Sequence, residues 1–146
     1  MKHKVLVIDD DQSLLEILQT NLQAEGFEVV TASSGSEGLA KLKSDKPDLV
    51  ILDVLMPGMD GWEVLRKIEE DPDTAGTPVV MLTAVHGTDQ VIRGLEEGAV
   101  EYITKPFYPA DLIATVKIML KVFDPSMRRY YREQLIAKRK RSLLRK

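Results

Sequence analysis

The sequence LVILD occupies residues 49–53, and VLMPGMDG follows directly at residues 54–61. A continuous apolar run of this length is typical of a strand that is buried on both faces of a parallel sheet. Asp53 would then lie where the strand reaches the surface, and Pro57-Gly58 would form a turn that leads into a helix. This segment therefore predicts an α/β protein with a carboxylate at the end of a buried strand.

The same arrangement recurs along the chain, because short apolar runs alternate with amphipathic segments. The predicted strands are residues 5–8, 27–32, 49–53, 79–83 and 100–104. The predicted helices lie between Asp11 and Gly26, between Ser34 or Ser36 and Pro47, and at residues 61–70, 88–97 and 111–123. Since crossovers between parallel strands are right-handed, few topologies remain. We predict a flavodoxin-like, doubly wound sheet of five parallel strands in the order 2-1-3-4-5, flanked by five helices.

Charge divides the chain into two parts. The net charge of −3 is the sum of −11 over residues 1–124 and +8 over residues 125–146. We therefore expect an acidic domain at 1–124 and a basic tail at 125–146, which is helical or partly disordered. The tail contains a block of four basic residues at 138–141, which nucleic acid, an anionic membrane surface or an acidic partner could attract.

Composition excludes several classes of function. The chain of 146 residues has no cysteine, so disulfides and thiolate chemistry are excluded. No apolar stretch approaches the roughly 20 residues of a transmembrane helix, and a cytoplasmic location is expected. His3 and His86 lack a spacing typical of metal ligands, so we assign them solvated or packing roles.

Polar side chains stand where four of the predicted strands end. Asp9 and Asp10 follow the first strand and Lys105 follows the fifth. Asp53 is the last residue of the third strand, and Thr83 is the last residue of the fourth. In the predicted topology, the crevice beyond strands one and three would bring the acids together. Neighbouring carboxylates repel one another, so the site must either retain protons or recruit cations. Hard oxygen ligands favour Mg²⁺, with Mn²⁺ as the possible substitute, over zinc.

The chain resembles the receiver domains of two-component response regulators, including the single-domain receivers of chemotaxis. The resemblance covers residues 4–123 and is carried by Asp9-Asp10, Asp53 with residues 56–61, Thr83-Ala84 and Lys105-Pro106-Phe107. It implies that residues 1–124 form a receiver domain. It also implies that Asp53 accepts a phosphoryl group from a sensor histidine kinase, a phosphotransfer protein or a small phosphodonor.

The resemblance assigns the remaining roles as well. It implies that Lys105 and Thr83 contact phosphoryl oxygens, and that Mg²⁺ is held by Asp9, Asp10, Asp53 and the backbone carbonyl of Leu55. The family is not enzymatic in the usual sense, since a receiver catalyses only its own phosphorylation and its own slow dephosphorylation. Leu55 and Val85 are apolar and cannot orient an attacking water, so we expect a long-lived phosphorylated state.

The resemblance further implies a switch. When Thr83 moves toward the phosphoryl group, Tyr102 turns inward and the surface of the fourth helix, fifth strand and fifth helix changes. That surface would control a downstream protein or a phosphorylation-dependent homodimer. The bond between Lys105 and Pro106 is expected to be cis.

Other interpretations fit single motifs. A strand-end aspartate such as Asp53 often only opens a turn, and Asp11 is suited to cap a helix. A flavin or nucleotide binder would share the sheet, but its first loop would need glycine or hydroxyl residues in place of acids. A Mg²⁺-dependent aspartyl-phosphate phosphatase would normally have an acid two residues after the nucleophile, where this chain has Leu55.

Overall fold

The computed structural model describes residues 2–84, 101–122, 130 and 137, with the exception of the Thr83 side chain. Its parallel strands form one sheet in the order β2-β1-β3-β4-β5. The strands are β1 (Lys4–Ile8), β2 (Glu28–Ala32), β3 (Leu49–Leu52), β4 (Val79–Thr83) and β5 (Glu101–Thr104). The predicted flavodoxin-like order is therefore confirmed.

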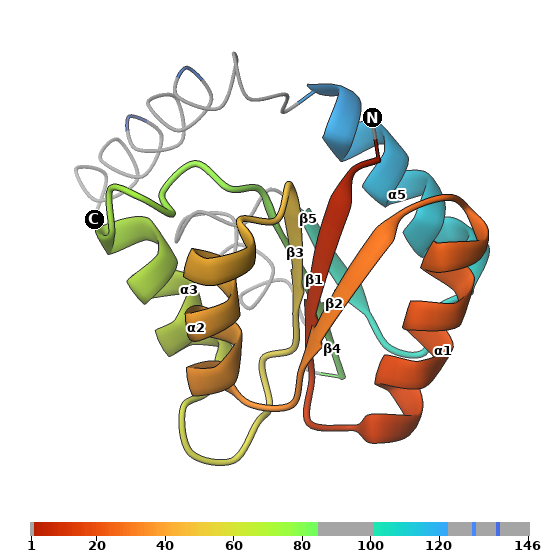
Figure 1. Ribbon diagram of the computed structural model, residues 1–146. Coiled ribbons are helices and arrows are strands. Elements are labelled where there is room, and N and C mark those ends of the chain that lie inside the picture. Colours follow the sequence, from red (N-terminus) through yellow and green to blue (C-terminus); the bar gives the residue numbers. More distant parts are fainter. Residues whose placement is uncertain (1, 85–100, 123–129, 131–136, 138–146) are drawn as a thin grey trace.

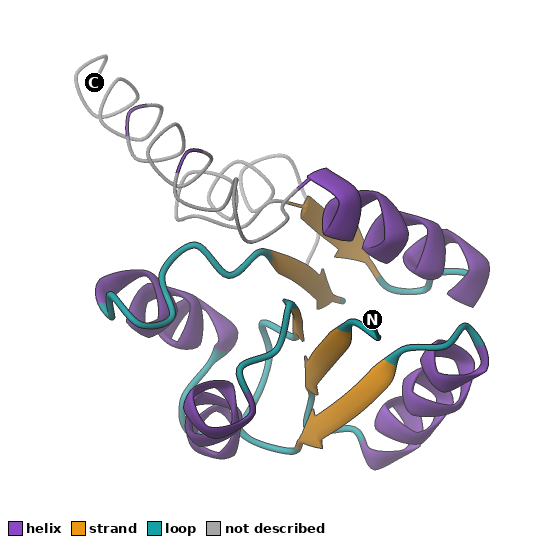
Figure 2. Ribbon diagram, turned by 45° about the horizontal axis from the view of Figure 1, so that its top comes forward, coloured by secondary structure: helices purple, strands orange, loops and turns teal. Residues whose placement is uncertain are grey.

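Helices cover both faces of the sheet. They are α1 (Gln12–Ala24), α2 (Gly35–Asp45), α3 (Gly61–Glu70) and α5 (Pro109–Val122). Figures 1 and 2 show α1 and α5 on one face and α2 and α3 on the other. The helix predicted at 88–97 lies outside the described residues, as does the tail apart from the helical residues Tyr130 and Ala137.

The central strands are buried on both faces, as their unbroken apolar sequences predict. In β1, Leu6 and Ile8 belong to a cluster with α2 and α3 side chains, whereas Val5 and Val7 belong to a cluster with α1 and α5 side chains. This division follows from the two-residue period of a strand. All residues of β3 are likewise buried. The two clusters fix β1 and β3 firmly at the centre of the sheet.

The helix ends show which sequence signals were decisive. Asp11 caps α1 as predicted, because its carboxylate accepts the amides of Ser13 and Leu14 at 3.0 and 3.3 Å. Ser34, rather than Ser36, caps α2 by accepting from the amide of Glu37.

One predicted helix boundary was wrong by two residues. Helix α5 begins at Pro109, not at Asp111. Proline suits a first helical position because the amide that it lacks would have no helical partner there.

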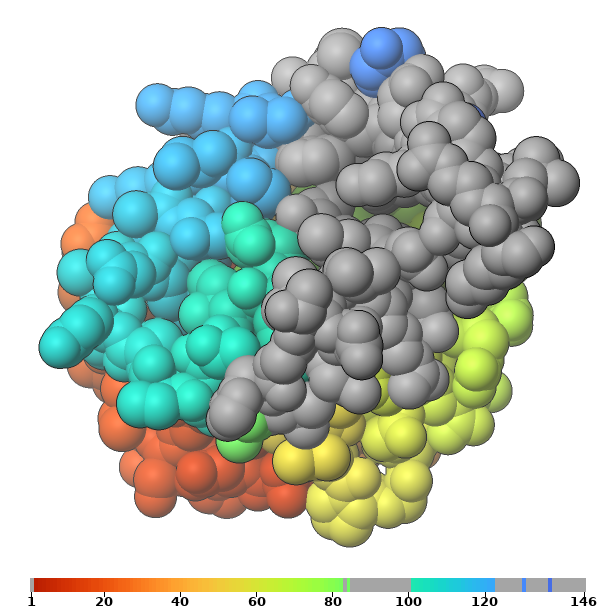
Figure 3. All heavy atoms as spheres, turned by 180° about the vertical axis from the view of Figure 1, so that it is seen from behind, coloured from red at the N-terminus to blue at the C-terminus, as the bar shows by residue number. Residues whose placement is uncertain are grey.

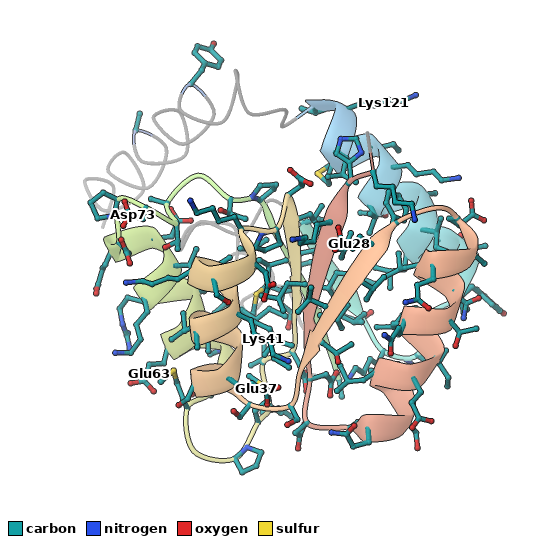
Figure 4. All side chains as sticks on the ribbon, viewed as in Figure 1. Glu28, Glu37, Lys41, Glu63, Asp73 and Lys121 are labelled. Atoms are coloured by element: carbon teal, nitrogen blue, oxygen red, sulfur yellow. The ribbon has the colours of Figure 1, made fainter. Side chains whose placement is uncertain are left out.

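Side chains of α2 also tie the helix to its neighbouring strand. Lys41 donates from Nζ to the carbonyl oxygen of Thr31 at 2.5 Å and pairs with Glu37 at 2.9 Å. Figure 4 shows Glu37 and Lys41 one helical turn apart on α2. The bond from Lys41 to Thr31 holds α2 against β2.

Candidate functional site

Asp9 and Asp53 follow directly after the neighbouring strands β1 and β3. The amide of Asp9 donates to the carbonyl oxygen of Ala32, and the amide of Asp53 donates to that of Ile8, both at 3.0 Å. These bonds extend the sheet pairing one residue beyond each strand. Strand β3 thus ends at Leu52, and Asp53 stands just outside it. Both carboxylates are held at the same edge of the sheet.

The predicted acidic cluster is present. Carboxylate oxygens of Asp9, Asp10 and Asp53 all lie within 4.8 Å of one another. Asp9 and Asp53 are buried, with 2% and 4% of their surface exposed, whereas Asp10 is exposed. Figure 3 shows, from behind, that the yellow segment after β3 and the red start of α1 lie at the same end of the molecule.

Lys105 supplies a positive charge to this cluster. Its Nζ lies 3.0 Å from Oδ2 of Asp9 and 3.7 Å from Oδ2 of Asp53. The other oxygen of Asp9 accepts the amide of Asp11 at 2.9 Å. The bond between Lys105 and Pro106 is cis, as predicted. The ammonium therefore offsets two buried carboxylates, which would otherwise be costly to keep charged.

The donor set fits Mg²⁺. It consists of carboxylate oxygens, with no imidazole or thiolate, and Asp10 leaves one side open to water. Within the described part of the chain, no second group of three potential metal ligands lies this close together.

Tyr102 lies on β5, and 8% of its surface is exposed. Burial is the main cause that raises the pKa of its phenol, and the negative charge of Asp53 raises it further. Thr83 is the last residue of β4, but its hydroxyl lies outside the described part, as does Val85. Tyr102 is therefore buried and electrostatically coupled to Asp53.

Removing the charge of Asp53 should lower the pKa of Tyr102 while leaving it above the usual value, because burial remains. We expect this shift in Asp53→Asn, measured by NMR titration of tyrosines labelled at Cζ. The unaltered chain, titrated under the same conditions, is the reference. An unchanged Tyr102 titration in the variant would contradict the coupling.

The raised pKa of Tyr102 in the unaltered chain also contributes to the stability of the fold. The folded chain holds the phenol proton more tightly than the unfolded chain does. This contribution is therefore complete below the usual tyrosine pKa of about 10 and is lost as the pH rises through the raised value.

Sequence reasoning used Gly61 as part of a motif and as the first residue of the helix predicted at 61–70, and it missed the contact that Gly61 makes with the loop that follows Asp53. Its amide donates to the carbonyl oxygen of Val54 at 2.8 Å, so the start of α3 lies against the residue after Asp53. No pattern in the sequence marked this role, because the atoms that crowd Gly61 belong to the backbone of Asp53 and Val54 across the loop.

A doubly wound parallel sheet, with an acidic crevice beyond β1 and β3, defines a flavodoxin-like protein. The chain belongs to the response regulator receiver domain family, whose family model matches residues 5–117. It is therefore a receiver domain of two-component signalling, and the flavin-binding and phosphatase alternatives are set aside.

Individual relatives agree with this assignment. The chain is 44% identical over 121 residues to the DNA-binding response regulator MtrA of Mycolicibacterium smegmatis, covering 83% of this chain and 52% of that protein. It is 43% identical over 121 residues to the alkaline phosphatase synthesis transcriptional regulatory protein PhoP of Bacillus subtilis, covering 83% of this chain and 50% of PhoP. The chain thus spans about half the length of these relatives.

Solved structures show the same fold. The chemotaxis protein CheY4 of Vibrio cholerae is 35% identical, with a TM-score of 0.77, over 81% of this chain and 98% of CheY4. A putative response regulator from Chloroflexus aurantiacus is 39% identical, with a TM-score of 0.78, over 83% of this chain and 99% of that chain. No helix in the described part is long and apolar enough to cross a membrane.

Proposed function

We propose that Asp53 accepts a phosphoryl group from the phosphohistidine of a sensor histidine kinase or phosphotransfer protein. One carboxylate oxygen of Asp53 forms a bond to phosphorus while the bond from phosphorus to the donor imidazole breaks, and the imidazole then takes a proton from solvent. The observation that carries the proposal is the cluster of Asp9, Asp10 and Asp53 with the Lys105 ammonium 3.7 Å from Asp53.

The other residues have roles that suit this reaction. The ammonium of Lys105, which pairs with carboxylates before the reaction, would pair with a phosphoryl oxygen after it. The hydroxyl of Thr83 would donate a hydrogen bond to a second phosphoryl oxygen. Asp9, Asp10, Asp53 and the carbonyl of Leu55 would hold Mg²⁺, or Mn²⁺ in its place. When bound, the ion offsets negative charge that develops on the phosphoryl oxygens. Such a chain acts as a phosphoacceptor and processes only its own phosphoryl group.

The signalling partners belong to the same proposal. Phosphorylation would change the surface that includes β5 and α5, through Thr83 and Tyr102, and so control a downstream protein or a homodimer in the cytoplasm. The basic tail at 125–146 would contact an anionic partner. DNA is the first partner to test, by salt-dependent binding that truncation after Asp124 removes.

A direct test is incubation of the chain with a small phosphodonor and Mg²⁺, followed by intact mass measurement and sizing chromatography. We expect one phosphoryl adduct that does not form when EDTA removes the metal. Full adduct formation in EDTA would contradict the metal requirement, and no adduct in Mg²⁺ would contradict the proposed function.

The phosphorylated state should last minutes or longer in Mg²⁺ buffer. The side chain of Leu55 is 58% exposed beside the acceptor and offers no group that could orient water. We expect Leu55→Asn to shorten the half-life by about tenfold, because the amide can orient an attacking water. This is less than the roughly 10²-fold or more in rate that a positioned proton-transfer group can supply. The measurement is loss of the adduct mass after the phosphodonor is removed.

Ile17→Asn is the matched control, because Ile17 is a similarly exposed aliphatic residue, at 49%, on α1. Its half-life should equal that of the unaltered chain. A half-life of seconds in the unaltered chain would contradict the prediction.

A further inference from the structure

The start of α3 is pressed against the backbone that carries the acceptor. A Cβ atom built at Gly61 would collide with the carbonyl oxygen of Asp53, and would lie 2.7 Å from Cα of Val54 and 2.9 Å from the carbonyl carbon of Asp53. All three neighbours are backbone atoms, which cannot rotate away as a side chain can. No residue larger than glycine fits at position 61 without moving the chain at Asp53.

Space, and not an unusual backbone angle, is what requires glycine here. Gly58, in the same loop, has a φ of +76° and nothing within 4 Å of an added Cβ, so it serves the turn conformation. Gly61 has no such positive φ. The two glycines of the motif therefore meet different demands, and only Gly61 bears on the acceptor.

Hydrogen bonds hold both ends of the loop from Asp53 to Gly61. The amide of Gly61 donates to the carbonyl oxygen of Val54 at 2.8 Å, and the amide of Asp53 donates to Ile8 of β1 at 3.0 Å. Asp60 caps α3 by accepting the amide of Glu63 at 2.9 Å. The segment from Asp53 to Gly61 is thus fixed at one end by β1 and at the other by α3.

We propose that Gly61 is a positioning residue for the acceptor and for the metal ligands. This inference rests on the proposed function. Close approach of α3 fixes the peptide between Asp53 and Val54, and through it the carboxylate of Asp53 and the backbone carbonyl of Leu55. Gly61 itself touches neither metal nor phosphoryl group.

Gly61→Ala should damage the site more than the fold. Separating the methyl group from the Asp53 backbone requires a shift on the order of 1 Å, and misplacement of that size can cost about 10²-fold in rate. We expect an initial phosphorylation rate lowered by about 10²-fold at saturating Mg²⁺. The Mg²⁺ concentration for half-saturation, measured by calorimetry without phosphodonor, should rise by about tenfold or more.

Gly26→Ala is the matched control. Gly26 lies between α1 and β2 with a φ of +91° and nothing within 4 Å of an added Cβ, so the same methyl group strains a turn without meeting the backbone at Asp53. Ser34→Ala is a second control, because it removes the cap of α2 without adding an atom beside Asp53. Both should lower the urea midpoint of unfolding while leaving Mg²⁺ affinity and the phosphorylation rate within about twofold.

The unaltered chain provides a test that needs no variant to fold. If α3 and the metal loop form one unit, Mg²⁺ should slow hydrogen exchange of the Gly61 amide by about tenfold, relative to the Gly38 amide, which is bonded to Ser34. Unchanged Gly61 exchange with Mg²⁺ bound would overturn the inference. So would a folded Gly61→Ala variant with normal Mg²⁺ affinity and rate, or an equal loss of affinity and rate in Gly26→Ala.

Failure of the proposed function gives a different result. In that case the unaltered chain itself forms no adduct on Asp53. The inference about Gly61 fails when the unaltered chain reacts normally and the alanine variant reacts equally well.

Discussion

Asp53→Asn should abolish phosphorylation and leave the fold intact. The variant keeps the shape of the side chain but lacks the anionic oxygen that would form the bond to phosphorus. Intact mass after incubation with phosphodonor and Mg²⁺ should show no adduct. The change removes one of three clustered negative charges, and Lys105 still pairs with Asp9 at 3.0 Å. Because repulsion within the cluster falls, the free energy of unfolding without metal should rise by about 1 kcal/mol.

A matched control is Asp45→Asn, which removes an acid at the end of α2, away from the cluster. It should be phosphorylated at the normal rate. An adduct that persists in Asp53→Asn would show that another residue accepts the phosphoryl group.

Lys105→Met should damage both stability and phosphoryl transfer. Without the ammonium, Asp9 and Asp53 are buried with their main positive partner removed. Removing one partner of a buried ion pair commonly costs about 3–5 kcal/mol. We expect about 2–3 kcal/mol from urea unfolding at neutral pH, because the Lys105 side chain is 23% exposed and solvent screens part of the interaction.

The rate should fall by about 10²–10³-fold, as when other preorganised charge-stabilising donors are removed. Mg²⁺ should recover part of the lost stability in Lys105→Met, since it binds the folded cluster. Lys105→Arg keeps the positive charge and should recover part of the stability. Its larger, planar guanidinium cannot take the position of the compact ammonium beside Asp9 and Asp53, so the rate should stay low.

Lys117→Ala is the control for loss of a surface ion pair. Lys117 pairs with Glu25 at 2.7 Å, but both side chains are largely exposed, at 50% and 40%. Its removal should cost no more than about 1 kcal/mol and leave the rate unchanged. If Lys105→Met were as mild as Lys117→Ala in both measurements, Lys105 would not hold the acidic cluster together.

Much of the fold was accessible from the sequence for a simple reason. Strands buried on both faces require unbroken apolar runs, and residues 5–8, 49–52 and 79–82 have them. Alternation with amphipathic segments then restricts the topology, and the strand ends bring Asp9, Asp10 and Asp53 together without any detailed geometry. The family resemblance supplied the roles, which composition and periodicity could not.

Other features depend on geometry that no sequence pattern encodes. Ser34 and Ser36 are equally good caps by residue type, and only the path of the chain selects Ser34. The approach of Lys105 to both Asp9 and Asp53 depends on how β5 and its following loop lie against β1 and β3. The crowding at Gly61 arises from atoms of Asp53 and Val54, which lie across a loop, and it became visible only in three dimensions.

The central claim is that Asp53 is the phosphoryl acceptor, and locating the phosphoryl group tests it most directly. The chain would be treated with a small phosphodonor and Mg²⁺, reduced with borohydride to mark any acyl phosphate, digested, and sequenced by mass spectrometry. We predict a single marked residue, Asp53, which disappears when EDTA replaces Mg²⁺. A mark on Asp9, Asp10 or any other residue, with Asp53 unmodified, would contradict the claim.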